Sequence, residues 1–246
     1  MLRFLLFFLI LPFLSKAQTD TTAYYGQIRM LELEYGFHQP IGDLNARFDF
    51  FSSVGGGISV LTKNDIQFQL GANLFFGNRV DQDVLSELRT ESGLIIGSDG
   101  RDAAVFLRMR GAKYKFMVGK IFRTNELNRN GLKVMLGLGH QSNWTRIQDD
   151  SQSLTQASGD YIYGYDRLAS GFSLEQFVGY QALAKNSNLN FYAGLEASQS
   201  FNSFRRKFNF GEPDLFGKKS LDIILGVRIG VMLTFYNFEA PEEIYY

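Results

Sequence analysis

The clearest pattern along the chain is a two-residue alternation at positions 221–236, in which one set is entirely apolar and the other mixes charge and glycine with only two apolar residues, Ile224 and Met232. An α-helix, with ~3.6 residues per turn, would scatter both sets of positions around its surface. A strand separates them onto two faces, and this strand is longer than the ~5 to 6 residues usual in soluble sheets. The stretch therefore predicts a membrane-crossing strand with one face toward lipid. Its apolar face holds Leu221, Ile223, Leu225, Val227, Ile229, Val231, Leu233 and Phe235.

The same alternation recurs upstream and predicts seven more strands. In the fourth of them, Leu107 and Met109 have the opposite parity to Tyr114 and Phe116, which predicts a β-bulge near Gly111. In the sixth, Gln176 is a polar exception on the apolar face. The seven predicted strands cover 28–37, 53–62, 66–77, 105–122, 132–147, 168–183 and 189–198.

The connections between these strands alternate between long and short. Bacterial outer-membrane barrels have even strand numbers, short periplasmic turns and long external loops. The pattern predicts an all-β fold, an eight-stranded antiparallel transmembrane up-and-down β-barrel with long extracellular loops and both termini in the periplasm. A lipocalin-like barrel or a sandwich is the soluble alternative, but strand length and aromatic residues near strand ends favour the membrane. The predicted long loops are 38–51, 78–104 (with a short amphipathic helix at 81–89), 148–166 and 201–219.

The N-terminus has the pattern of a secretory signal peptide. Arg3 precedes the apolar run 4–14, and Ser15-Lys16-Ala17 offers small residues before a cleavage site. A spanning helix is the alternative, but it needs ~20 apolar residues. We therefore expect export to the outer membrane of a Gram-negative cell. The expected organisation is a signal peptide at 1–17, an N-terminal periplasmic segment at 18–27, the barrel at 28–236 and a periplasmic tail at 237–246.

Composition excludes several classes of function. The formal net charge is zero, so nothing indicates nucleic-acid binding. The chain has no cysteine, which removes disulfides and thiolate metal sites. The glycine run 55–57 lacks the Lys-Ser/Thr ending of a phosphate loop, and the Asp149-Asp150 pair is too small for a good calcium site. We expect no cofactor and no metal.

The inward positions of the predicted barrel carry charges that nearly balance. Eight strands leave room only for side chains, so these charges must pair. We expect Arg228 to meet Glu32 or Glu34 where the last strand closes against the first. A proton or ion path is the alternative interpretation. The predicted network is Glu32, Glu34, Lys113, Lys115, Glu175, Glu196, Asp222 and Arg228.

Two loop segments are candidate contact sites. Arg205, Arg206 and Lys207 lie among phenylalanines, a combination that can bind lipopolysaccharide phosphates or a protein partner. A solvated loop is the alternative. The apolar run 93–97 lies in the second long loop and suggests docking.

One fragment resembles an enzyme family. The sequence His140-Gln141-Ser142-Asn143 is similar to the His-x-Ser-Asn core of outer-membrane lipid A deacylases, which are also eight-stranded barrels. Parity places His140 and Ser142 outward, as the resemblance implies for a Ser-His pair acting on a lipid ester. No third carboxylate can be assigned.

As a whole, the chain resembles small outer-membrane barrels of the OmpA/OmpX transmembrane type in strand number, loop alternation and aromatic girdles. It also resembles uncharacterised barrel proteins through 40–44, 55–57 and Tyr165-Asp166-Arg167-Leu168. Only 237–246 follow the last predicted strand, so we expect no peptidoglycan-binding domain of the kind that the larger OmpA proteins carry after the barrel. We expect a non-enzymatic structural or interaction barrel, in concrete form an accessory subunit of a secretion or assembly machine. The alternatives are a lipid A-modifying hydrolase and a narrow, porin-like channel.

Overall fold

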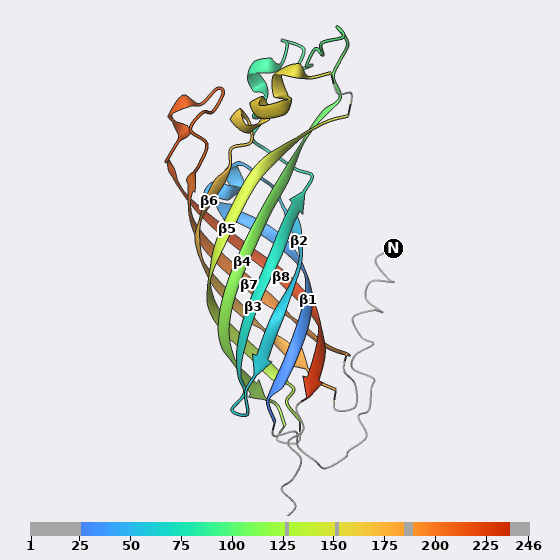
Figure 1. Ribbon diagram of the computed structural model, residues 1–246, viewed down its shortest axis with the longest axis vertical. Helices are drawn as coiled ribbons and strands as arrows, with labels where there is room; N and C mark the ends of the chain where they lie inside the picture. The colour runs from blue at the N-terminus through green and yellow to red at the C-terminus, as the bar shows by residue number, and fades with distance from the viewer. Residues whose placement is uncertain (1–25, 126–127, 151–152, 185–188, 237–246) are drawn as a thin grey trace, which may run out of the picture.

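The chain closes into a single antiparallel barrel (Figure 1). The computed structural model describes residues 26–125, 128–150, 153–184 and 189–236, so the predicted signal peptide and C-terminal tail lie outside the described residues. Each strand pairs with its sequence neighbours, and β8 pairs with β1. The prediction of an eight-stranded up-and-down barrel is confirmed. The strands are β1 (Ile28–Gly42), β2 (Phe51–Leu61), β3 (Ile66–Gly77), β4 (Val105–Arg123), β5 (Gly131–Asp149), β6 (Ala169–Ala182), β7 (Leu189–Phe204) and β8 (Lys219–Tyr236).

The closing seam runs from Ile28 opposite Tyr236 to Gly42 opposite Asp222. The first strand is thus longer than the sequence suggested, because 38–42 belongs to β1 and not to a loop. Pairing of β1 with β2 ends at His38, so Pro40 lies where the strand has only one neighbour. Proline is tolerated at such a position because fewer ladder bonds need its missing N–H.

The predicted bulge near Gly111 is wrong. Strand β4 pairs residue for residue with β5 along its whole length and with β3 over residues 109–120, and both pairings run through Gly111 without interruption. Side chains continue to alternate inward and outward without a shift, but the apolar residues change from the outer face to the inner one. Leu107 and Met109 point inward, where Met109 is fully buried. The outward positions Arg108 and Arg110 become charged because the strand extends beyond the apolar band.

The distribution of apolar and charged side chains between the outer face and the lumen is the reverse of that in a soluble barrel. Outward side chains such as Leu33, Leu74 and Leu195 are 61%, 61% and 66% exposed, whereas the lumen holds buried charged residues. An apolar outer wall around a polar interior is the arrangement of a bilayer-spanning barrel of the outer membrane. A lipocalin-like barrel or sandwich would have the reverse arrangement. None of the helices in the described ranges has the length and apolar character to span a membrane.

The connections from β2 to β3, from β4 to β5 and from β6 to β7 leave their strands at one end of the barrel, which we call the short-turn end. The opposite, long-loop end carries 43–50, 78–104, 150–168 and 205–218 (Figure 1). The predicted helix at 81–89 is only a 3-10 turn, Ser86–Leu88. The described residues of the 78–104 and 150–168 connections pack around a shared core and form what we call the loop lobe. Its core includes Val84, Leu85, Ile95, Ile147, Leu154, Ala157 and Tyr165.

The long-loop connections also contain short 3-10 helices. They are η2 (Asp43–Ala46), η4 (Thr155–Ala157), η5 (Gly159–Gly164) and η6 (Pro213–Leu215), beside the η3 turn described above.

Candidate functional site

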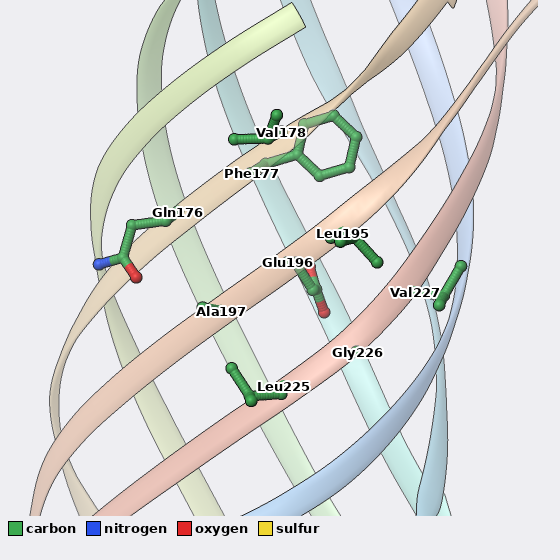
Figure 2. A pocket seen from close by; sticks show the side chains of 9 residues that line it. All are labelled: Gln176, Phe177, Val178, Leu195, Glu196, Ala197, Leu225, Gly226 and Val227. Atoms are coloured by element: carbon green, nitrogen blue, oxygen red, sulfur yellow. The ribbon is translucent and has the colours of Figure 1, made fainter.

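The outer wall has a shallow hollow across β6, β7 and β8 (Figure 2). Its volume is about 520 Å³, and Ala197, which lies between Gln176 and Leu225 on the outer face, leaves it open because its side chain is small. Gln176, the polar exception on this face, exchanges two amide hydrogen bonds of 2.9 Å with Gln199 of β7. The two amides therefore satisfy each other, and the hollow remains part of the lipid-facing wall.

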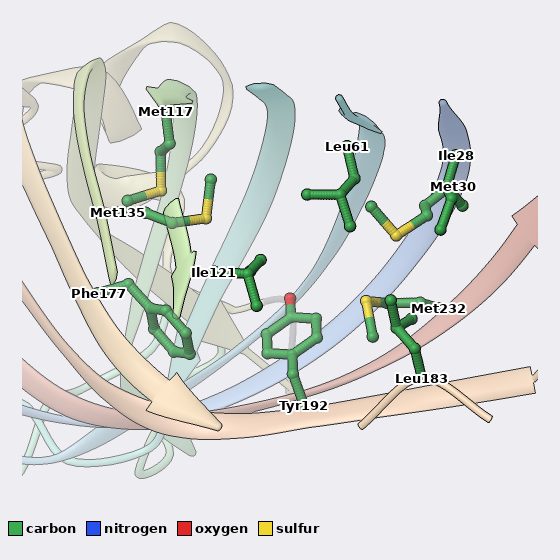
Figure 3. Close-up of a cluster of buried hydrophobic side chains, with 10 residues drawn as sticks. All are labelled: Ile28, Met30, Leu61, Met117, Ile121, Met135, Phe177, Leu183, Tyr192 and Met232. Atoms are coloured by element: carbon green, nitrogen blue, oxygen red, sulfur yellow. The ribbon is translucent and has the colours of Figure 1, made fainter. Parts of the chain in front are cut away.

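The lumen is filled in three layers. Apolar side chains close the short-turn end (Figure 3). A second apolar group closes the long-loop end. The ion pairs around Arg228, Glu34 and Glu196 lie between these two layers. The first layer comprises Ile28, Met30, Leu61, Met117, Ile121, Met135, Phe177, Leu183, Tyr192 and Met232. The second comprises Leu44, Phe48, Phe51, Phe75, Met109 and Ile224.

Arg228 lies at the centre of the charged layer. Its Nη1 is 3.6 Å from Glu34 Oε2 and 3.3 Å from Glu196 Oε2. The guanidinium also lies over the Phe177 ring, 4.2 Å from the centroid. The structure thus brings Arg228 to Glu34, and not to Glu32, among the two partners considered from the sequence.

Glu34 has charged or polar partners on three other strands. Lys115 forms an ion pair with it, and the Tyr192 hydroxyl donates to Oε2 at 2.8 Å. Gly230 makes room for this contact, because a Cβ there would lie 2.2 Å from the Tyr192 ring. Glu34 therefore joins β1 to strands β4, β7 and β8.

Two other carboxylates of the predicted network, Glu175 and Glu32, have partners of their own. Glu175 binds Lys113 at 2.9 Å and accepts a hydrogen bond from Ser198 at 2.9 Å. Glu32 accepts from Gln67 and Gln69 at 2.9 and 2.7 Å. Its nearest cation is Lys133, 3.9 Å away.

Asp222 lies apart from the cations of the lumen. It accepts from the amides of Asn143 and Asn202 at 2.9 and 2.6 Å. Asn143 in turn accepts from Arg47 at 2.8 Å. Asp222 therefore connects the barrel to the long-loop end.

His38 is a lumen residue that the sequence reasoning missed. Its Nδ1 is 3.1 Å from Glu196 Oε1, and its Nε2 is 2.8 Å from Ser53 Oγ. The assignment of 38–51 to a loop concealed it. The sequence did contain a signal for its inward position. If the strand continues past Phe37, which points outward, the next residue, His38, must point inward.

A second network ties the long loops together around Arg47. Its Nη2 donates to the Arg167 carbonyl at 2.7 Å, and its guanidinium lies near the rings of Phe48 and Phe204 at 4.9 and 5.0 Å. Burial lowers the pKa of Arg47 to about 10, although the negative charge of Asp222 opposes the shift. Arg47 thus remains a buried cation at neutral pH.

The segment 165–168 connects three of the long loops. Arg167, in the left-handed region with φ of 50°, donates to the carbonyls of Gly164, at 3.1 Å, and Phe210. Asp166 accepts two 3.0 Å hydrogen bonds from Arg206 Nε, and Arg206 Nη2 also contacts it. The motif noted in the sequence therefore lies where the 43–50, 150–168 and 205–218 connections meet.

The predicted basic contact residues differ in their surroundings. Arg206 is held by Asp166 and lies 4.5 Å from the Tyr163 ring centroid, whereas Arg205 and Lys207 are exposed. Large aromatic side chains, Tyr161 and Phe208, are also exposed at this end. In the 93–97 run, Ile95 is buried in the lobe, while Leu94 and Ile96 are exposed.

The enzyme-like fragment has the outward position expected from parity. His140 Nε2 lies 2.8 Å from Ser170 Oγ, and Ser142 Oγ also lies 2.8 Å from Ser170 Oγ. Ser170 thus stands between the two residues of the resemblance. Within the described ranges, no carboxylate forms an ion pair with His140.

Comparisons with known proteins find no matching family model and no matching curated protein. Solved structures with a similar arrangement include the Neisserial surface protein A (TM-score 0.47, 11% identity, 84% of this chain and 97% of that one). Another is Ail, the attachment invasion locus protein of Yersinia pestis, in complex with the heparin analogue sucrose octasulfate. It matches with a TM-score of 0.44 and 15% identity, over 85% of this chain and 99% of that one. A major outer membrane protein from Thermus thermophilus matches with a TM-score of 0.44 and 12% identity, over 84% of this chain and 99% of that one. At these scores the membrane assignment depends on the barrel's own surface.

Proposed function

We propose that this protein is a non-enzymatic outer-membrane barrel that serves as an interaction subunit, in concrete form an accessory subunit of a secretion or assembly machine. The long-loop end faces the cell exterior, following the rule that external loops are long. The observation that carries the proposal is the buried Arg47 network, which ties three long loops into one body. A chain that only anchored itself in lipid would not need ordered loops.

The exposed aromatic and basic residues of the long-loop end support a protein partner. Tyr161 and Phe208 are 66% and 67% exposed, and Arg205 and Lys207 are exposed on the 205–218 connection. Aromatic residues and arginine are the side chains enriched at energetically important positions of protein interfaces. Since the loops are already held in place, binding would cost little ordering entropy.

Affinity purification from detergent-solubilised membranes tests this proposal. We expect the tagged wild-type protein to recover a defined set of subunits, and the Tyr161→Ser/Phe208→Ser variant to lose them. Phe50→Ser is the matched control, because Phe50 is an exposed aromatic at the same end on another connection. Recovery of the wild-type protein alone, as a monomer, would contradict the proposal.

The filled lumen makes conduction the less favoured function. Two apolar layers enclose the ion pairs, so an ion would have to displace packed side chains. In planar bilayers we expect no stable open state. A stable single-channel conductance would support the alternative of a narrow channel.

The hydrolase alternative depends on one observation, the 2.8 Å contact between His140 and Ser170. Serine hydrolases also need a carboxylate that orients the histidine, and none pairs with His140 in the described part of the chain. We expect no deacylation of lipid A by the wild-type protein. Deacylation that is lost in both Ser170→Ala and His140→Gln would establish the enzyme instead.

A further inference from the structure

Three arginines lie on the outer wall, above the apolar band, at the long-loop ends of β4 and β5. Arg108 and Arg110 share the outward parity of Tyr114, and Arg146 shares that of His140. Arg146 is exposed, and the other two are half-buried. We call these three residues the arginine triplet.

The register of the two strands brings like charges together. Arg108 and Arg146 are directly opposite each other, and Arg110 lies between Trp144 of β5 and Phe76 of β3. Like charges directly opposite on adjacent strands destabilise a sheet. The arrangement therefore needs a compensating anion.

No residue of the described chain supplies that anion. Arg108 donates to the neutral side chains of Gln148 and Asn78, at 2.5 and 2.6 Å. Arg110 donates to main-chain carbonyls, that of Met109 at 2.7 Å. No carboxylate in the described ranges forms an ion pair with any member of the triplet, in contrast to Arg206 with Asp166.

The surface below the triplet matches the rest of an amphiphilic molecule. Directly toward the bilayer lie the small residues Ala112 and Ser142, then Tyr114 opposite His140, then the exposed Phe116 opposite Leu138. A lipid would match this order, with its anionic head group at the arginine triplet and its apolar chains along the apolar residues below. A soluble anion would have no use for the apolar part.

We propose that Arg108, Arg110 and Arg146 form a binding site for the phosphate groups of an outer-leaflet lipid, whose acyl chains lie along the wall of β4 and β5. Guanidinium groups bind phosphate through paired, charge-assisted hydrogen bonds. The site differs from the 205–207 segment considered in the sequence analysis. It is independent of the proposed partner binding, because it needs only the isolated barrel and a lipid.

Native mass spectrometry of the purified, detergent-solubilised barrel titrated with bisphosphorylated lipid A tests the site. The test variant is Arg110→Gln/Arg146→Gln. The matched control is Arg29→Gln/Lys120→Gln, which removes two exposed outward cations at the short-turn end. A heat-dependent gel shift verifies that each variant is folded. We expect affinity to fall at least about tenfold in the test variant and to change less than about twofold in the control.

Two further ligands identify the source of the phosphate. Lipid A without its phosphates should bind at least about tenfold more weakly than the bisphosphorylated form, since the arginines then have no anion to bind. Equal binding of the two lipids, or unchanged binding by the test variant, would overturn the site. Inorganic phosphate or heparin that binds as tightly as the phosphorylated lipid would overturn the assignment to a lipid.

Discussion

The lumen and the long-loop end both depend on buried arginines, but they use them differently. In the lumen, Arg228 meets the carboxylates of Glu34 and Glu196. At the long-loop end, Arg47 and Arg167 donate mainly to main-chain carbonyls of other loop residues. The barrel ladder already satisfies the main chain of the strands, whereas loops have no such ladder.

This difference separates two tasks. Lumen arginines neutralise charge within a frame that the backbone has already set. Loop arginines take the place of the missing ladder and so determine the path of the chain. Substitutions in the lumen should therefore affect the whole barrel, and substitutions among the loop arginines should act locally.

The largest effect is expected for Arg228→Leu. Two buried carboxylates, Glu34 and Glu196, would lose their shared cation, which costs about 3–5 kcal/mol. Urea unfolding followed by the heat-dependent gel shift measures the loss. Normal assembly and an unchanged midpoint would show that the seam pairing has no role in stability. Arg228→Lys, which keeps the charge, should retain part of the stability.

Gly230→Ala is the next test of the lumen. A new Cβ would meet the Tyr192 ring at 2.2 Å and move its hydroxyl away from Glu34. Overpacking of this kind costs about 1–3 kcal/mol, measured as a lower urea midpoint. In a Tyr192→Ala background the same substitution should cost almost nothing. If Gly230→Ala lowers the urea midpoint equally with and without the Tyr192 ring, the strain does not come from contact with Tyr192.

Arg47→Met should disturb the loops and leave the barrel intact. The Arg167 carbonyl and the Asn143 side chain would lose buried donors, a local cost of about 1–3 kcal/mol. Hydrogen exchange should become faster at 159–167, with no change in the urea midpoint of the barrel. A midpoint as low as that of Arg228→Leu would contradict the division between the two regions.

Asp166→Asn should have the smallest effect. Arg206 would lose its ionic acceptor, but its side chain is partly exposed, so the cost is about 1 kcal/mol or less. Trypsin cleavage after Arg205 and Arg206 should become faster. High salt should raise cleavage of the wild-type protein toward the rate of the variant. A variant as resistant as the wild type would show that this pair does not hold the 205–218 connection.

Local periodicity explains how much of this could be predicted. The two-residue period in 221–236 and its repeats predicted eight strands and the inward position of Glu34 and Arg228, because side-chain direction in a strand depends only on parity. The bulge predicted in β4 was wrong because the outward residues near the long-loop end of this strand become charged where the strand leaves the bilayer. Arg47 could not be found from the sequence: it lies in a connection without periodicity, and its partners, Asn143 in β5 and Arg167 in another connection, lie 96 and 120 residues away.

The position of Glu34 has a consequence for the order of assembly. It lies on the first strand made, yet Lys115, Tyr192 and Arg228 arrive with the fourth, seventh and eighth. Until the last strand is present, its carboxylate must be solvated by water in an open sheet. Closure of the ring and dehydration of the lumen are therefore one event. A truncated or stalled chain would keep a wet, charged interior that resists release into the membrane.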